Sequence, residues 1–247
     1  MKKFVVAIIF MCSLSVSAKP TAVLFDCDGV LVNTPYMKYE AWKKALNEQN
    51  IDITIDEYRP FIGHSLAHIA NAIAAKHDFK IDQAKLIARR DLYYKAEQKK
   101  GVPLLEPGIA YLNMLLENKY ALDIKIAVVS SDTREAIMRN LEFADVKYKL
   151  LDGVFSGRDD LQHINDPEGT NKPKPYVYQL AAQKLGIDPK TTIVFEDSSS
   201  GVIAAHTAGM IVVAVPNVLT DKQDFAKANY IAYFENLGLD FILDASD

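Results

Sequence analysis

Cysteine is scarce in this sequence: the 247 residues hold two, Cys12 and Cys27. We expect residues 1–18 to be removed as a secretory signal, which would leave Cys27 as the single thiol. No disulfide can then form within the chain, even in an oxidising compartment. Cys27 stands between two aspartates, and in an extended segment its side chain should point away from theirs. The pattern therefore favours a small buried hydrophobic residue over a nucleophile.

Dense blocks of Lys or Arg are also absent, and the formal net charge is −4. This charge argues against a nucleic-acid-binding surface, so we expect no nucleic-acid partner. Beyond the amino terminus no apolar run suggests a membrane span, and we expect no membrane association of the mature form. With 49% hydrophobic residues the chain can bury the core of one large domain, alone or with a small satellite, and we expect a monomer.

The amino terminus has the pattern of a secretory signal. Lys2 and Lys3 give it a positive start, residues 4–14 are apolar, and residues 16–18 (Val-Ser-Ala) are typical of a cleavage site. We therefore predict export, to the periplasm or outside the cell, after cleavage near Ala18. The alternatives for this stretch are a first β-strand and a mis-started reading frame, and the alternative location is the cytoplasm.

Strand and helix patterns alternate along the rest of the chain. Apolar runs predict strands at 22–25, 124–129, 150–155, 192–195 and 210–215, and helical periodicity predicts helices at 108–118, 176–185 and 201–208. The segment from Asp132 to Glu135 is typical of a capping box that opens a further helix. This alternation predicts an α/β fold with a doubly wound parallel sheet, a Rossmann-like core.

A helical insertion separates the first two strands. About a hundred residues lie between them, far more than a crossover needs. Helical patterns fill the insertion, and we find no convincing strand in it. We therefore predict a small helical cap domain, residues 35–103, inserted into a core domain formed by residues 19–34 and 104–247. Such a cap would lie over the strand ends as a lid.

Two carboxylates close together end the first strand. Asp26 and Asp28 follow the apolar run, and Gly29 can turn the chain sharply after them. Because like charges at this spacing repel, a divalent cation between them is the simplest way to keep both ionised. The alternatives are an ordinary acidic turn and a calcium loop. A calcium loop is disfavoured because residues 30–32 are Val, Leu and Val, where oxygen donors are needed.

Polar residues also follow the ends of later strands. Ser130 follows the second strand, Glu196 and Asp197 follow the strand 192–195, and Lys172 stands just before a helix. The carboxyl ends of parallel strands meet at one edge of the sheet, where ligands bind. Carboxylates, a hydroxyl and an ammonium group at this edge indicate a metal site beside an anion site, and phosphate suits that anion site best.

These motifs together resemble those of the haloacid dehalogenase superfamily of aspartate-nucleophile phosphotransferases. The four matching motifs are Asp26-Cys-Asp28-Gly29, Ser130, Lys172 with its Pro-x-Pro tail, and Glu196-Asp197 followed by Ser-Ser-Ser-Gly201. The resemblance covers nearly the whole mature chain. The helical insertion after the first motif places it nearest the β-phosphoglucomutase-like subgroup, which has a small helical cap.

The resemblance implies a role for each core residue. Asp26 would attack phosphorus and form an aspartyl phosphate, and Asp28 would protonate the leaving alcohol and then deprotonate the hydrolytic water. Lys172 would balance charge on the nucleophile and the transferring group, and Ser130 would hold phosphoryl oxygens. The implied Mg²⁺ ligands are Asp26, Asp197 and the backbone carbonyl of Asp28. For Glu196 the resemblance implies a place in the first or second coordination shell, and the alternative is an acid that only caps a helix.

Substrate binding is expected from Gly29, Thr34, Ser131, Lys38 and His64. Relatives often carry a His where this chain has Lys38, which could bind a second anionic group or be solvated. His64 could line the pocket, cap a helix or be solvated. Mutases of the subgroup carry an Arg soon after the cap glycine, and this chain has none there.

The predicted function is a Mg²⁺-dependent phosphatase that hydrolyses a small phosphorylated metabolite, such as a sugar phosphate, through an aspartyl-phosphate intermediate. The alternative is a β-phosphoglucomutase-like phosphosugar mutase, which the missing Arg and the predicted signal disfavour. The third possibility is a secreted protein that uses the fold for binding without catalysis. The polar loop 156–171 is longer than the family usually needs, and the sequence assigns it no role.

Overall fold

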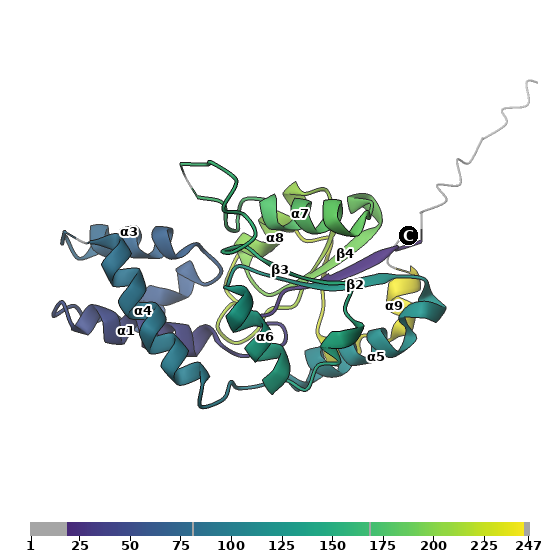
Figure 1. Ribbon diagram of the computed structural model, residues 1–247, viewed down its shortest axis with the longest axis horizontal. Helices are drawn as coiled ribbons and strands as arrows, with labels where there is room; N and C mark the ends of the chain where they lie inside the picture. Colours follow the sequence, from purple (N-terminus) through teal and green to yellow (C-terminus); the bar gives the residue numbers. More distant parts are fainter. Residues whose placement is uncertain (1–18, 81, 168, 245–247) are drawn as a thin grey trace, which may run out of the picture.

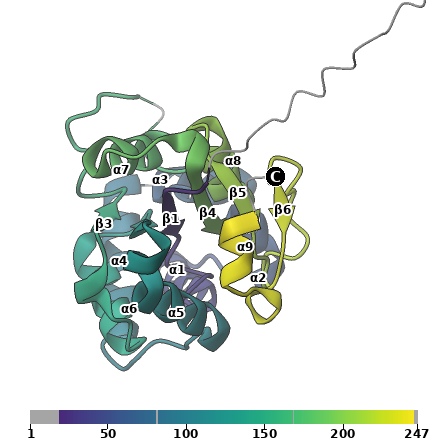
Figure 2. The same ribbon diagram turned by 90° about the vertical axis from the view of Figure 1, so that its right-hand side faces the viewer.

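The computed structural model describes residues 19–80, 82–167 and 169–244 (Figure 1). Its centre is a six-stranded sheet in the order β3-β2-β1-β4-β5-β6, with neighbouring strands parallel. Figure 2 shows β3 toward one side of this sheet and β6 at the other. The strands are β1 (Ala22–Phe25), β2 (Lys125–Ser130), β3 (Gly153–Ser156), β4 (Thr192–Glu196), β5 (Ile211–Ala214) and β6 (Tyr230–Ile231).

Helices cover both faces of the sheet (Figure 1). α5 (Glu106–Leu122), α6 (Arg134–Phe143) and α9 (Leu239–Asp244) pack on one face, and α7 (Tyr176–Leu185) and α8 (Ser199–Thr207) pack on the other. Side chains alternate along a strand, so Val23 and Phe25 enter the α5 side while Leu24 enters the α7 side. All three are fully buried. Since burying such a side chain contributes roughly 1.5–3 kcal/mol, both layers hold β1 in place.

The helices inserted between β1 and α5 lie together at one end of the molecule, on the left in Figure 1. They pack around a core of their own that includes the fully buried Trp42. Two linkers join this layer to the sheet: Val32 pairs with Leu104, and the amide of Asn33 donates to the carbonyl of Pro103 at 2.7 Å. The inserted elements are α1 (Pro35–Asn47), α2 (Ile55–Tyr58), η1 (Arg59–Phe61), α3 (Leu66–Lys76) and α4 (Gln83–Gln98).

This architecture confirms the predicted fold class, while the exact domain boundaries at 35 and 103 stay a proposal. One predicted strand is shorter than expected, because the start of the run 150–155 belongs to a 3₁₀ turn and β3 begins only at Gly153. The helix expected at 108–118 is longer at both ends. The remaining 3₁₀ turns are η2 (Tyr148–Leu150), η3 (Pro189–Thr191) and η4 (Phe234–Asn236).

Helix α6 begins differently from the prediction. Thr133 is its N-cap, and its hydroxyl accepts a hydrogen bond from the amide of Ala136 at 3.3 Å. The predicted capping box from Asp132 to Glu135 is therefore wrong. Glu135 instead forms ion pairs with Lys95 and Arg139. Asp132 lies before the cap, which leaves its carboxylate available for contacts elsewhere.

The predicted signal, residues 1–18, lies outside the described residues. Within the part of the chain that the structure describes, no helix combines the length and the apolar content needed to cross a membrane.

Candidate active site

The carboxyl edge of the sheet brings the strand-end residues together. In the parallel register Phe25 pairs with Val128 of β2 and with Phe195 of β4, so the residues after these strands become neighbours. The amide of Asp26 donates to the carbonyl of Phe195 at 3.0 Å, which extends the β1 ladder into the site. This edge collects the predicted catalytic and metal-binding residues Asp26, Asp28, Ser130, Glu196 and Asp197.

Lys172 is buried between two of these carboxylates. Its Nζ lies 2.6 Å from Asp26 Oδ1 and 2.6 Å from Glu196 Oε1, and 2% of the residue is exposed. Tyr178 donates to the same Glu196 oxygen at 2.6 Å. Burial alone would lower the pKa of Lys172, but Asp26 and Glu196 hold it well above its ordinary value. The ammonium is therefore charged and shared between both acids.

The buried carboxylates outnumber the cation between them. Burial is the largest cause that raises the pKa of Asp26 to about 7, and Lys172 opposes it. The pKa of Asp197 is raised well above its ordinary value by burial and then by Asp26 and Glu196. Asn217 donates its Nδ2 to Asp197 Oδ2 at 2.8 Å, which offsets this only in part. A second cation at this place would stabilise the ionised carboxylates.

Three of these acids have the geometry of a metal site. One carboxylate oxygen each from Asp26, Glu196 and Asp197 lies within 4.8 Å of the other two, and all three residues are buried. Glu196 Oε1 accepts hydrogen bonds from Lys172 and Tyr178, whereas Oε2 accepts one from Ser198 at 3.4 Å and no other from the described residues. Hard, charged oxygen donors suit Mg²⁺. The donor set therefore fits the predicted divalent cation.

Asp28 is held by side chains from both layers. Ser130 donates to its Oδ2 at 3.0 Å, Thr34 donates to its Oδ1, and Lys38 Nζ lies 3.0 Å from Oδ1. Lys38 comes from α1 and also lies 3.3 Å from Asp132 Oδ2. Burial would lower the pKa of Lys38, but these two acids hold it well above its ordinary value. Lys38 is thus an ion-pair bridge between the inserted helices and the sheet, not a solvated lysine.

Three predicted residues lie behind the carboxylates. Thr34 and Ser130 are fully buried against Asp28, and the Gly29 carbonyl accepts a hydrogen bond from Asn217 at 3.3 Å. Gly29 has φ of 91°, and a Cβ there would lie 2.0 Å from a carboxylate oxygen of Asp197, so the position requires glycine. These residues position the acids, and their direct contact with substrate stays a prediction.

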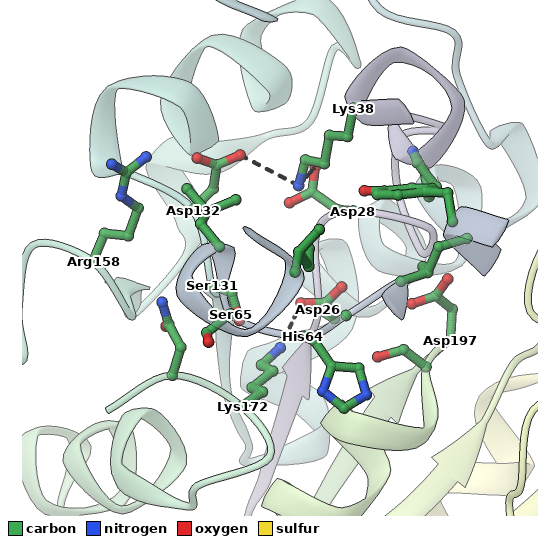
Figure 3. A pocket seen from close by; sticks show the side chains of 18 of the residues that line it. Asp26, Asp28, Lys38, His64, Ser65, Ser131, Asp132, Arg158, Lys172 and Asp197 are labelled. Atoms are coloured by element: carbon green, nitrogen blue, oxygen red, sulfur yellow. Dashed lines mark hydrogen bonds and ion pairs between the residues drawn. The ribbon is translucent and has the colours of Figure 1, made fainter. Parts of the chain in front are cut away.

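A pocket with a free volume of about 80 Å³ lies between the inserted helices and the carboxyl edge (Figure 3). This is room for a few water molecules or a phosphoryl group, and is well below the usual size of a ligand pocket. The predicted residues on its wall are Asp26, Asp28, Lys38, His64, Ser131, Lys172 and Asp197.

His64 lines this pocket with its imidazole stacked on that of His68, the ring centroids lying 4.5 Å apart. Burial and then the neighbouring imidazole lower its pKa, which favours the neutral ring. Cys27 is fully buried, and burial raises the pKa of its thiol well above the ordinary value. The expectation that Cys27 is a buried residue and not a nucleophile agrees with this placement.

Sequence reasoning missed several polar residues on the pocket wall, among them Arg90, Asp132, Arg158 and Asn171. Arg90 is 2% exposed although it lies on a helix whose sequence is highly charged. Arg158 pairs with Asp91 of α4 at 2.8 Å and so joins the polar loop to the inserted helices. No motif marks these positions, and the one available signal was the unusual length of the loop 156–171.

Comparison with known proteins decides the family. The sequence model of one protein family, the haloacid dehalogenase-like hydrolases, matches residues 23–215. The chain belongs to the haloacid dehalogenase-like hydrolases. This confirms the family that the four motifs suggested, and it identifies the chain as a member of an enzyme family.

This haloacid dehalogenase-like hydrolase resembles proteins with several names. Protein SUPPRESSOR OF QUENCHING 1 of Arabidopsis thaliana is 30% identical over 209 residues, which are 82% of this chain but only 18% of the plant protein. Phosphorylated carbohydrates phosphatase of Thermotoga maritima is 26% identical, covering 85% of this chain and 92% of its own. The crystal structure of β-phosphoglucomutase from Clostridium difficile is 25% identical, with a TM-score of 0.72 over 92% of this chain and 97% of that one.

Proposed function

We propose that this protein is a Mg²⁺-dependent phosphatase that hydrolyses a small sugar phosphate through an aspartyl phosphate. The observation that carries the proposal is the placement of Asp26. Its carboxylate lies on the pocket wall, contacts the ammonium of Lys172 and belongs to a buried group of three acids that fits a divalent cation. The phosphatase from Thermotoga maritima supports the phosphorylated carbohydrate as the substrate class.

The reaction begins with nucleophilic attack by Asp26. A carboxylate oxygen of Asp26 bonds to phosphorus while the bond from phosphorus to the leaving oxygen breaks. Lys172, 2.6 Å from Asp26, stabilises the negative charge that accumulates on the phosphoryl oxygens. A bound Mg²⁺, held by Asp26, Asp197 and Glu196 or the carbonyl of Asp28, would supply positive charge to the same oxygens.

Asp28 serves both half-reactions. Its carboxyl group gives a proton to the leaving alkoxide, which departs as the alcohol. The resulting carboxylate then takes a proton from the water that attacks the aspartyl phosphate, so that inorganic phosphate leaves and Asp26 is regenerated. Lys38, Thr34 and Ser130 hold this carboxylate in one orientation.

A phosphate-release assay on a panel of sugar phosphates, with Mg²⁺ and with EDTA, tests the proposal. We expect Mg²⁺-dependent turnover in the wild type and loss of at least about a thousandfold in Asp26→Asn, which keeps the shape of the side chain. Asp123→Asn removes the same charge from an exposed turn and should retain activity. Turnover in Asp26→Asn equal to wild type would refute the nucleophile.

Analysis of the sugar phosphates left in the same reactions separates the alternatives. A phosphosugar mutase would convert a hexose 1-phosphate to the 6-phosphate, with a bisphosphate primer and without net release of phosphate. A binding protein would turn over no ester on the panel. The resemblance to β-phosphoglucomutase is the reason to test for conversion of a hexose 1-phosphate.

We also propose that the protein is exported and acts as a monomer. Residues 16–18 supply the expected cleavage site. Sequencing the amino terminus of the protein recovered outside the cytoplasm should give a start at Lys19, and light scattering should give the mass of one chain. An intact Met1, or a dimer mass, would contradict the respective proposal.

A further inference from the structure

One side of the pocket carries four charged residues, of which only Lys38 has a role in the mechanism. We use the name distal wall for Lys38, Arg90, Asp132 and Arg158, all of which line the pocket. Figure 3 shows Lys38, Asp132 and Arg158 together, away from Lys172 and His64, with the carboxylate of Asp28 near Lys38. The distal wall therefore faces the part of a substrate that lies beyond Asp28.

Several polar atoms at this wall lack a hydrogen-bond partner. Asp132 is 7% exposed, and among the described residues Lys38, at 3.3 Å, is the one partner of its Oδ2. Arg90 is 2% exposed, and its Nε donates no hydrogen bond to any residue that the structure describes. The hydroxyl of Ser131, on the same pocket, is also without a partner. Buried polar atoms without a partner cost free energy, so the Arg90 Nε and the Ser131 hydroxyl are two possible donors to a ligand, and the Asp132 carboxylate can accept a further hydrogen bond beside its ion pair with Lys38.

The charges of the distal wall are already balanced. Lys38 pairs with Asp28 and Asp132, while Arg90 Nη1 and Arg158 Nη2 both pair with Asp91, at 3.0 and 2.8 Å. Burial would lower the pKa of Arg90, but Asp132 is the chief cause that keeps it above its ordinary value. Each of the three cations of the distal wall is thus paired with a carboxylate of the described residues.

A second phosphate would fit this wall poorly. It would bring roughly 1.5 to 2 negative charges next to Asp132, where each described cation of the wall is already paired with a carboxylate. A neutral hydroxyl meets no such repulsion. It can donate a hydrogen bond to Asp132 Oδ2, whose one partner among the described residues is Lys38.

We propose that Asp132 is a specificity-determining residue, which makes the distal wall bind the hydroxyls of a neutral sugar and reject a second anionic group. The substrates are accordingly sugar monophosphates and not bisphosphates. This inference rests on the phosphatase activity proposed above and names the substrate class of the same site.

The test compares glucose 1-phosphate and glucose 6-phosphate with glucose 1,6-bisphosphate, using the full-length chain and measuring kcat and KM for phosphate release. The wild type should have a higher kcat/KM for a monophosphate than for the bisphosphate. In Asp132→Asn, the ratio of kcat/KM for the bisphosphate to kcat/KM for the monophosphates should rise about tenfold or more, mainly because KM for the bisphosphate falls. Asparagine can still accept from the amide of Thr133, as Asp132 does at 2.9 Å, so the loop keeps its local bond.

Asp123→Asn, at the opposite end of β2, removes the same charge and should leave the ratio unchanged. A wild type that prefers the bisphosphate would overturn the inference without any variant. So would a folded Asp132→Asn whose ratio equals that of the wild type. If no ester in the panel is hydrolysed, the proposed function fails, and this inference fails with it.

Discussion

Replacing Lys172 with methionine should reveal how strongly one ammonium group stabilises the buried acids. The change keeps most of the side-chain volume and removes the charge that lies 2.6 Å from both Asp26 and Glu196. Removing one partner from a buried ion pair costs about 3–5 kcal/mol, because the other charge stays buried without compensation. We expect a loss of that size in the free energy of unfolding in EDTA, at about pH 8.

The loss should depend on pH in a defined direction. Without Lys172 the pKa of Asp26, already raised to about 7, should rise further. When the pKa of a carboxyl group is higher in the folded than in the unfolded protein, the folded state holds the proton more tightly. The free energy of unfolding then falls as the pH rises from the unfolded pKa toward the folded one. The deficit of Lys172→Met relative to wild type should therefore shrink as the pH falls from the variant's higher pKa of Asp26 to about 7, where Asp26 of the wild type also takes up its proton.

Urea unfolding followed by circular dichroism measures both effects. Lys174→Met is the matched control, because Lys174 is two residues away, about one third exposed and paired with Asp166 at 3.4 Å. A pair of this kind contributes at most about 1 kcal/mol. Equal unfolding free energies for the two variants at about pH 8, or a deficit in Lys172→Met that does not shrink at lower pH, would refute the reasoning.

Two further substitutions probe the supports of the site. Gly29→Ala should lower the free energy of unfolding by at least about 1 kcal/mol and abolish most activity, because the new Cβ would clash with Asp197. Gly101→Ala, which is also at positive φ but has open space around it, should keep its activity. Thermal unfolding and phosphate release measure both effects. Lys38→Met should lower kcat about tenfold or more, because Asp28 loses its cation, while Lys43→Met on the same helix should not; an unchanged kcat in the first would contradict the role of Lys38.

The core of the site could be predicted because it depends on local sequence and simple geometry. Asp26 and Asp197 each follow a short apolar run, and parallel pairing of β1 with β4 brings such residues to one edge. Lys172 was predictable only from its motif. Its position between two acids depends on the loop after residue 156, which folds back to the sheet edge and has no local pattern that predicts this path.

The distal wall could not be predicted in the same way. Arg90 reaches the pocket only because α4 packs on α1 and both lie against the sheet edge, which is a tertiary arrangement without a local signature. Asp132 was assigned to a helix cap, a role that Thr133 fills instead. Hydroxyls expected to face substrate, Thr34 and Ser130, hydrogen-bond to Asp28, because a buried carboxylate needs donors of its own.

The central claim is that Asp26 accepts the phosphoryl group, and trapping the intermediate tests it most directly. The wild type is mixed with a hydrolysed sugar phosphate, quenched within the first turnover and treated with borohydride, which reduces an acyl phosphate to the alcohol. Peptide mass spectrometry should then find homoserine at position 26 in the wild type and not in enzyme without substrate. Turnover without modification of Asp26, or modification at Asp28 instead, would contradict the account.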